Sequence, residues 1–147
     1  MIFYDRQDAG RQLANRLLSY QNNPNTVVLG LSCGGMPIAF EISQLLQLSI
    51  HTLIVRKIRS PQNLNLALGA VAEQDVELLH SELIGILDIP NDYIKKETEN
   101  QKTYLARQVK SYNTCERLLY QKQVLLVDDG MATGSSMQAA IQALKKL

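Results

Sequence analysis

Residues 124–136 form the segment that most restricts how this chain of 147 residues can fold. They read Val-Leu-Leu-Val-Asp-Asp-Gly-Met-Ala-Thr-Gly-Ser-Ser. The first four residues have the unbroken apolar pattern of a buried strand, and the last five have the small side chains of a loop that starts a helix. Two carboxylates stand between them. In open α/β sheets, ligands bind outside the carboxyl ends of the strands, so the segment predicts an α/β fold with a ligand site at this strand end.

The rest of the chain alternates in the same way between apolar runs and helical patterns. Strands are predicted at 27–32, 52–55 and 124–127, one or two short strands at 67–79, and helices at 6–20, 37–46, 81–87, 92–112 and 137–147. Strands that alternate with helices favour a Rossmann-like, mostly parallel sheet flanked by helices. No repeat or linker interrupts the pattern, so we expect a single domain over residues 1–147.

The composition supports a folded domain and argues against several classes of function. Hydrophobic residues make up 46% of the chain, enough for a buried core at this length. The formal net charge of +1 gives no reason to expect broad electrostatic binding to nucleic acid or to an anionic membrane. Two cysteines, Cys33 and Cys115, are too few for a disulfide framework. No signal core is visible, and no stretch approaches the roughly 20 apolar residues of a membrane helix, so a cytoplasmic location is expected.

The loop after the two aspartates has the chemistry of a phosphate site. Ala132 to Ser136 offers consecutive backbone N–H groups, three hydroxyls and a helix N-terminus, and Gly134 lets the backbone approach an anion. The carboxylates of Asp128 and Asp129 would repel the same phosphate, so their natural partners are sugar hydroxyls or a divalent cation. Phosphate at one end and paired hydroxyls beside it describe a ribose 5-phosphate. An ordinary strand, turn and helix with a solvated acidic end is the alternative.

Residues 124–136 resemble the phosphoribosyl-diphosphate (PRPP) signature of the type I phosphoribosyltransferases. That signature is an apolar strand, two acidic residues, two variable residues, a small or acidic residue, and Thr-Gly followed by small hydroxyl residues. All thirteen positions fit it. Residues 3–10, 34–37, 55–57 and 69–73 extend the resemblance over most of the chain, which is similar to a bacterial group of predicted phosphoribosyltransferases.

The resemblance implies a role for each residue of the motif. Asp128 and Asp129 would hold the ribose 2- and 3-hydroxyls and, as the candidate catalytic residues, stabilise positive charge that develops on the ribose. The resemblance implies that PRPP is also bound by a loop of the protein that holds its 5-phosphate. The residues of this loop are Met131, Ala132, Thr133, Gly134, Ser135 and Ser136.

The resemblance also implies a pyrophosphate site. The residues matched to it are Cys33, Gly34, Gly35, Arg56 and Lys57. The first three belong to a turn that begins at Ser32, and the last two follow the second predicted strand and would add positive charge. The segment 58–68 corresponds to the mobile loop that closes over the reacting centre and excludes water. The implied cofactor is Mg²⁺, held through substrate oxygens and water and with no direct ligand from the protein.

Three features depart from the family pattern. Position 33 is Cys where related proteins usually have Arg, which removes a cation from the pyrophosphate loop. We expect a passive role for Cys33 because free cysteines are usually buried, and a reactive thiol is the alternative. Position 132 is Ala where enzymes acting on oxopurines carry an acidic base, which argues against hypoxanthine or guanine as acceptor by that mechanism. The chain also ends at Leu147, soon after the PRPP helix, so we expect the final strands of the family domain to be missing.

Two functions remain open on these residues. The first is a phosphoribosyltransferase that uses PRPP and Mg²⁺ to transfer ribose 5-phosphate to a small nitrogenous acceptor with release of pyrophosphate; the resemblance also implies a homodimer, which is common in that family. The second is a non-catalytic PRPP- or nucleotide-sensing regulator, which the cysteine at position 33 and the early end favour. A triphosphate hydrolase is excluded because the chain has no Gly-x-x-x-x-Gly-Lys-[Ser/Thr] loop. Neither His51 nor His80 lies in a motif, so edge or surface roles are expected for both.

Overall fold

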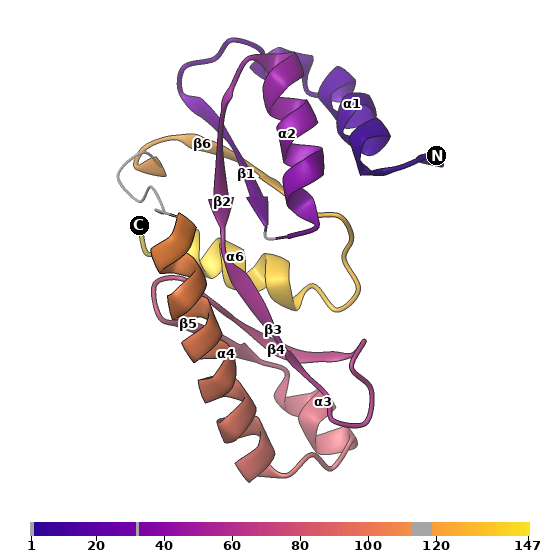
Figure 1. Cartoon of the computed structure of the whole chain (residues 1–147), viewed down its shortest axis with the longest axis vertical. Helices are drawn as coiled ribbons and strands as arrows, with labels where there is room; N and C mark the ends of the chain where they lie inside the picture. Colours follow the sequence, from indigo (N-terminus) through magenta and orange to yellow (C-terminus); the bar gives the residue numbers. More distant parts are fainter. Residues whose placement is uncertain (1, 32, 113–118) are drawn as a thin grey trace. The chain divides into compact units, whose positions relative to one another are not determined.

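A computed structural model describes residues 2–31, 33–112 and 119–147 of the chain (Figure 1). The chain divides into two compact units, Met1–Leu53 with Thr114–Gly130, and Ile54–Asn113 with Met131–Leu147. Each unit contains a three-stranded sheet and a hydrophobic core. Ser32 and Cys115, which entered the sequence argument, lie outside the described residues.

The first unit is built on a parallel sheet in the order β2-β1-β6. Its strands are β1 (Thr26–Leu31), β2 (Ser49–Leu53) and β6 (Gln123–Val127). All six residues of β1 are buried. This is expected for a central parallel strand that is covered on both faces and whose sequence is mostly apolar. The flanking strands β2 and β6 are only partly buried. Because the three strands are parallel, their carboxyl ends meet at one edge of the sheet.

Two helices, α1 (Arg6–Arg16) and α2 (Gly35–Leu46), lie side by side in this unit (Figure 1). The side chain of Asp5 caps α1 by accepting a hydrogen bond from the backbone N–H of Asp8 at 2.7 Å, which fixes where the helix begins. A short 3₁₀ turn, η1 (Leu18–Tyr20), follows α1. The apolar faces of both helices and the strands form one core, in which Ala14, Ala39 and Leu46 are fully buried.

The second unit is built on an antiparallel sheet in the order β3-β4-β5, with β3 at Val55–Arg59, β4 at Ala67–Ala72 and β5 at Val76–Leu79. Glu73, Gln74 and Asp75 connect β4 to β5, and the last two have positive φ angles of 63° and 52°. Two consecutive residues with positive φ suit the twist of a tight hairpin, and Asp is among the residues that tolerate this conformation. The pairing of Ala72 with Val76 shows that the hairpin is tight.

Three helices belong to the second unit: α3 (Ser81–Ile86), α4 (Asn91–Tyr112) and α6 (Ser135–Leu144). α4 packs on β3 and β4, and α6 packs on β4 and β5. Ile54, Ile58 and Leu68 are fully buried in the core that α4 helps to close. Glu73 is a buried acidic residue of this unit, and its carboxylate accepts the backbone N–H of Ile54 at 2.8 Å. This hydrogen bond offsets part of the cost of burying the carboxylate.

The α/β class and the parallel sheet flanked by helices are confirmed, and several predicted boundaries are corrected. The single strand predicted at 52–55 is wrong, because the chain leaves the parallel sheet at Leu53 and enters the antiparallel sheet at Val55. The opening helix ends at Arg16, and the second helix begins two residues before Pro37. In the part of the chain that the structure describes, no helix is both long and apolar enough to cross a membrane.

The segment predicted as a mobile loop, 58–68, is also corrected. Ile58 lies in β3 and Leu68 in β4, and both side chains are fully buried in the core. The connection between the strands therefore runs only from residue 60 to residue 66. A backbone hydrogen bond from Ser60 N–H to the Leu66 carbonyl at 3.0 Å joins the two ends of this connection.

Candidate functional site

The two aspartates of the motif follow β6 directly and belong to the first unit. The backbone N–H of Asp129 donates to Oδ1 of Asp128 at 2.9 Å. Arg6, at the start of α1, donates to Oδ2 of Asp129 from Nε at 3.0 Å and from Nη2 at 2.5 Å. This guanidinium holds the pKa of the Asp129 carboxyl below its ordinary value, against the opposing effect of partial burial. Asp129 is therefore an ionised hydrogen-bond acceptor at neutral pH.

The turn that precedes α2 lies directly beside these carboxylates. A methyl group on Gly34 would come within 2.7 Å of Oδ1 of Asp129, and one on Gly35 would overlap the carbonyl oxygen of Val127. Gly35 must therefore be glycine for the turn to approach the backbone of β6 so closely, whereas the Asp129 carboxylate could rotate away from a methyl group on Gly34. The structure thus brings together the predicted pyrophosphate turn and the predicted ribose carboxylates, because both follow neighbouring parallel strands.

The start of α2 offers backbone donors at this edge of the sheet. The N-cap residue of α2 is Gly34, which has no side chain and therefore cannot itself cap the first N–H groups of the helix. Cys33 is exposed beside the turn, which contradicts the burial that we expected for a passive cysteine. A helix N-terminus with available N–H groups is favourable for an anion.

The remaining part of the motif, residues 131–136, belongs to the second unit. Gly134 has a φ of +78° and ends the loop in the left-handed conformation, and α6 begins at Ser135. Met131 is 72% exposed, Ala132 is also exposed, and Thr133 is half-buried. Gly134 therefore supplies a backbone conformation that other residues rarely adopt, directly before the first turn of α6, and the role of this loop as a phosphate cradle stays a prediction.

A hydrogen-bonded chain inside the second unit involves a residue that sequence reasoning set aside. Nε2 of His80 lies 2.7 Å from Oγ of Ser135, and the same Oγ lies 2.7 Å from Oγ1 of Thr133. Ser135 is only 1% exposed, so its hydroxyl is enclosed by these two partners. The prediction of an edge or surface role for His80 missed this contact, because the two residues are 55 positions apart and no local spacing signals it.

Arg6 is the second functional candidate that sequence reasoning missed. It lies in the stretch 3–10 that supported the family resemblance, but nothing in its neighbours indicates a partner near residue 129. The pair is exposed to solvent, with 58% of the Arg6 side chain and 33% of the Asp129 side chain accessible. Its contribution to folding is therefore small, and its guanidinium is accessible to a ligand.

Arg56 and Lys57 do not follow the end of the second parallel strand, so that predicted position is wrong. Both lie inside β3 of the second unit. The Arg56 guanidinium donates to Gln101 of α4 at 2.9 Å and lies 5.3 Å from the ring centre of Tyr104. A cation over an aromatic face with a hydrogen-bonded amide is typical of a packing role on a helix. Lys57 is exposed.

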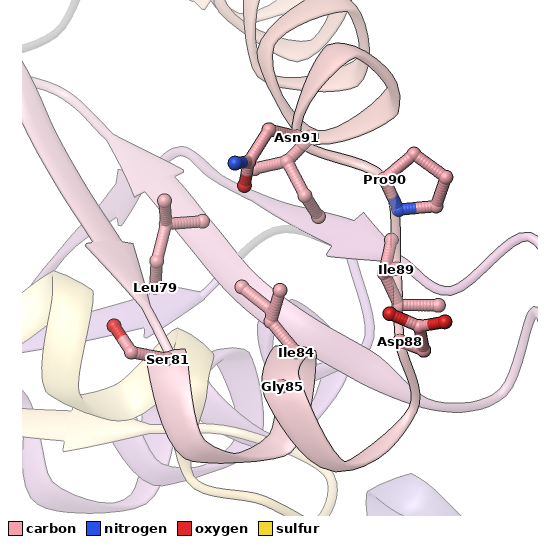
Figure 2. Close-up of a pocket in the computed structure, with 9 residues that line it drawn as sticks. Leu79, Ser81, Ile84, Gly85, Asp88, Ile89, Pro90 and Asn91 are labelled. Atoms are coloured by element: carbon pink, nitrogen blue, oxygen red, sulfur yellow. The ribbon is translucent and has the colours of Figure 1, made fainter.

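Two open cavities lie in the second unit. Figure 2 shows the larger, of about 540 Å³, between the end of β5, α3 and the start of α4. Its lining residues include Leu79, Ser81, Ile84, Asp88 and Asn91. The other, of about 490 Å³, shares Leu79 and Asn91 and extends along α4. No residue predicted to bind PRPP or pyrophosphate lines either of these two cavities.

Within the described ranges, no group of three His, Cys, Asp or Glu side chains is placed to hold a metal ion. Asp128 and Asp129 are neighbouring carboxylates, and Arg6 already bonds to one oxygen of Asp129. This donor set fits Mg²⁺ that takes most of its ligands from phosphate groups and water, since Mg²⁺ in proteins commonly uses one or two carboxylates together with substrate phosphates.

A helix start beside two carboxylates at a strand end and a hydroxyl-rich loop before α6 are typical of α/β proteins that bind phosphorylated ligands. The chain matches the family described as phosphoribosyl transferase domain over residues 4–147. It therefore belongs to the phosphoribosyl transferase domain family, as the resemblance predicted.

The names of two relatives agree with this membership, and two solved structures have a similar fold. Two Mycobacterium tuberculosis proteins from different strains, each named "Putative phosphoribosyl transferase", are 36% identical over 146 residues, which is 98% of this chain. The chain spans 33% of the length of these curated relatives. The crystal structure of TT1426 from Thermus thermophilus is 33% identical with a TM-score of 0.63, over 99% of this chain and 70% of that chain. A hypothetical protein from Neisseria gonorrhoeae with bound ppGpp is 14% identical with a TM-score of 0.51, over 99% of this chain and 63% of that chain, and shows the fold alone.

Proposed function

We propose that this domain binds PRPP with Mg²⁺ and transfers ribose 5-phosphate to a small nitrogenous acceptor with release of pyrophosphate. The observation that carries the proposal is the motif of residues 124–136, in which two neighbouring carboxylates follow a parallel strand and a loop rich in hydroxyl side chains precedes the next helix. Membership of the phosphoribosyl transferase domain family supports it. Both curated relatives named above carry transferase names as well.

Asp128 and Asp129 are the proposed partners of the ribose hydroxyls. Hydroxyl groups donate to ionised carboxylates, and Asp129 stays ionised because Arg6 lowers its pKa. Arg6 bonds to Oδ2, which leaves Oδ1 of Asp129 able to accept from a sugar hydroxyl. The negative charge of the pair would also favour positive charge on the ribose ring in the transition state.

The turn at Cys33 to Gly35 is the proposed pyrophosphate site. The bond between C1 of the ribose and the pyrophosphate oxygen breaks with its electron pair on the leaving group, and the acceptor nitrogen forms the new bond to C1. Backbone N–H groups at the start of α2 would stabilise the departing anion. Bound Mg²⁺ would neutralise part of the charge on the diphosphate. A role for Arg56 and Lys57 in this step stays a prediction, and the packing of Arg56 on α4 weakens it.

The loop 131–136 is the proposed site of the 5-phosphate. Its half-buried Thr133 hydroxyl, the left-handed Gly134 and the N-terminal turn of α6 supply the donors that a phosphate dianion needs. Ala132 is exposed and carries no acid or base, so the acceptor would be one whose nitrogen needs no deprotonation by this position.

Isothermal titration calorimetry with PRPP and Mg²⁺, followed by pyrophosphate release across a panel of nitrogenous bases, tests the proposal. Asp128→Asn/Asp129→Asn should weaken PRPP binding at least tenfold, since each carboxylate hydrogen bond to a ligand is worth about 1.5–3 kcal/mol. Asp75→Asn, at the β4–β5 hairpin, is a control that removes one carboxylate away from the motif and should bind like the wild type. Absence of PRPP binding, or equal binding by the double variant, would refute the site.

The same experiment separates the enzyme from the regulator. Pyrophosphate release that depends on one of the acceptors supports the transferase. Tight PRPP binding without release for every acceptor would instead establish a PRPP-binding regulator.

A further inference from the structure

His80 lies at the junction between β5 and α3, where its backbone is hydrogen-bonded on both sides. Its backbone N–H donates to the carbonyl of Leu68 at 2.8 Å, and its own carbonyl accepts from the N–H of Ile84 at 3.0 Å. The imidazole is therefore attached to a backbone that is hydrogen-bonded on both sides. From this position Nε2 reaches Oγ of Ser135 at 2.7 Å.

The contact places the imidazole at one end of a chain of hydroxyl groups. Ser135 Oγ lies between His80 Nε2 and Thr133 Oγ1, at 2.7 Å from each. Oγ1 of Thr133 also lies 3.5 Å from the backbone N–H of Ser135, the outer limit for an accepted hydrogen bond. Since the Ser135 side chain is 1% exposed, its single hydroxyl proton must go to one of these two neighbours.

The protons on the three side chains of His80, Ser135 and Thr133 can be arranged in two ways. If Nε2 of His80 carries a proton, it donates to Ser135, Ser135 donates to Thr133, and the Thr133 hydroxyl proton is free for a ligand. If Nε2 lacks a proton, Ser135 donates to His80 and Thr133 donates to Ser135, which leaves only lone pairs of Thr133 outside the chain. Lone pairs repel a phosphate, and a hydroxyl proton binds it.

We propose that His80 is a positioning residue that keeps a proton on Nε2 and thereby makes the Thr133 hydroxyl a donor to the 5-phosphate. The inference rests on the proposed function of loop 131–136 and adds to it a residue from outside the motif. Ser135 then acts through its backbone and as a relay, while Thr133, which is half-buried, contacts the anion. His80 itself does not touch the ligand.

The protonation of His80 can be measured in the wild-type protein without any ligand. Long-range ¹H–¹⁵N correlation spectra identify which ring nitrogen carries the proton, with His80→Gln used to assign the signal. We expect Nε2 of His80 to have the shift of a protonated nitrogen. An unprotonated Nε2 would overturn the proposal, whatever the protein binds.

Binding of ribose 5-phosphate gives the second measurement. His80→Ala should weaken it about tenfold, the size expected when one hydrogen bond to an anion loses its orientation. His80→Gln, whose side-chain amide can donate from a similar position, should stay within about threefold of the wild type. His51→Gln, the matched histidine substitution in the first unit, should leave binding unchanged.

The decisive comparison is made in a Thr133→Val background, where the hydroxyl that His80 orients is missing. There, His80→Ala should cost less than about twofold, because nothing remains to be oriented. A tenfold loss in that background would show a general structural role and refute the positioning role. If the wild type fails to bind ribose 5-phosphate and PRPP, the proposed function fails. The ¹⁵N result still decides the direction of the hydrogen bonds between His80, Ser135 and Thr133.

Discussion

The closest backbone approach around the candidate site predicts the effect of a single methyl group. In the Gly35→Ala variant, the new methyl would overlap the carbonyl oxygen of Val127 and lie 2.9 Å from Cα of Asp128. Both are backbone atoms of the segment that ends β6, so no side-chain rotation can relieve the overlap. The start of α2 must then move away from the end of the strand.

The magnitude follows from two opposing effects. Overpacking against a fixed backbone costs about 1–3 kcal/mol, and the gain from replacing glycine by alanine in a helix is about 1 kcal/mol. Gly35 is the first residue of α2, where the propensity gain is smaller than in a helix interior. We therefore expect Gly35→Ala to lower the free energy of unfolding by about 1–2 kcal/mol.

Gly34→Ala should behave differently although it changes the neighbouring residue. Its methyl would meet the carboxylate of Asp129, the end of a side chain that can rotate, and the backbone of Gly34 is already in the ordinary helical region. We expect a loss below about 1 kcal/mol in stability. Because the carboxylate must move, the contact with Arg6 and the binding of PRPP should both weaken.

Urea unfolding followed by circular dichroism measures both effects. With a slope of about 2 kcal/mol per molar urea, the Gly35→Ala midpoint should fall by roughly 0.5–1 M. Gly85→Ala in α3 is the matched control, since a methyl there has no neighbour within 4 Å, and it should be neutral or slightly stabilising. An unchanged midpoint for Gly35→Ala, at an unchanged slope, would show that the turn does not pack on the end of β6.

Three further predictions concern charge and packing. Arg6→Gln should raise the pKa of Asp129 toward its ordinary value, as seen by ¹³C titration of the carboxyl group. The depressed pKa contributes stability above about pH 4 that is lost as the pH falls, so the variant should be less stable at pH 7 by under about 1 kcal/mol and no less stable in acid. Leu68→Ala should cost about 2–5 kcal/mol because the side chain is fully buried, whereas Leu64→Ala, 66% exposed, should stay within about 0.5 kcal/mol of the wild type. Glu73→Ala should cost about 1–3 kcal/mol in urea unfolding by leaving a buried backbone N–H unpaired, and Glu73→Gln should recover most of the loss.

The features that local sequence could predict are those that depend on one continuous segment. The strand β1 is an apolar run that is buried at every residue, and an apolar run of this length has few other stable environments. The loop 131–136 is predictable for the same reason, since Gly134 and the hydroxyl residues around it specify a left-handed turn before a helix. In each of these segments, the residues of the segment itself determine the local structure.

No local sequence pattern shows that the chain leaves one sheet at Leu53 and enters the other at Val55. Thr52 to Val55 is a single apolar run, and hydrophobicity alone does not show which neighbour a strand pairs with. The pairing of β3 with β4 depends instead on a hairpin partner a dozen residues later and on burial of Ile58 and Leu68 against α4. This tertiary pairing places Arg56 beneath a helix rather than at the expected strand end.

Arg6, which sequence reasoning missed, shows why counting cations within a motif is a weak guide to an anion site. Cys33 lacks the positive charge that the family resemblance leads us to expect there, and in the sequence this favoured a regulator over an enzyme. In the folded first unit, however, Arg6 brings a guanidinium to Asp129, whose carboxylate lies against Gly34 of the same turn. The turn is therefore not left beside an uncompensated negative charge, because Arg6, which is 123 positions from Asp129 in sequence, supplies the cation. It follows that Cys33 alone does not argue against binding of a diphosphate, and that the choice between enzyme and regulator rests on turnover rather than on the residue at that position.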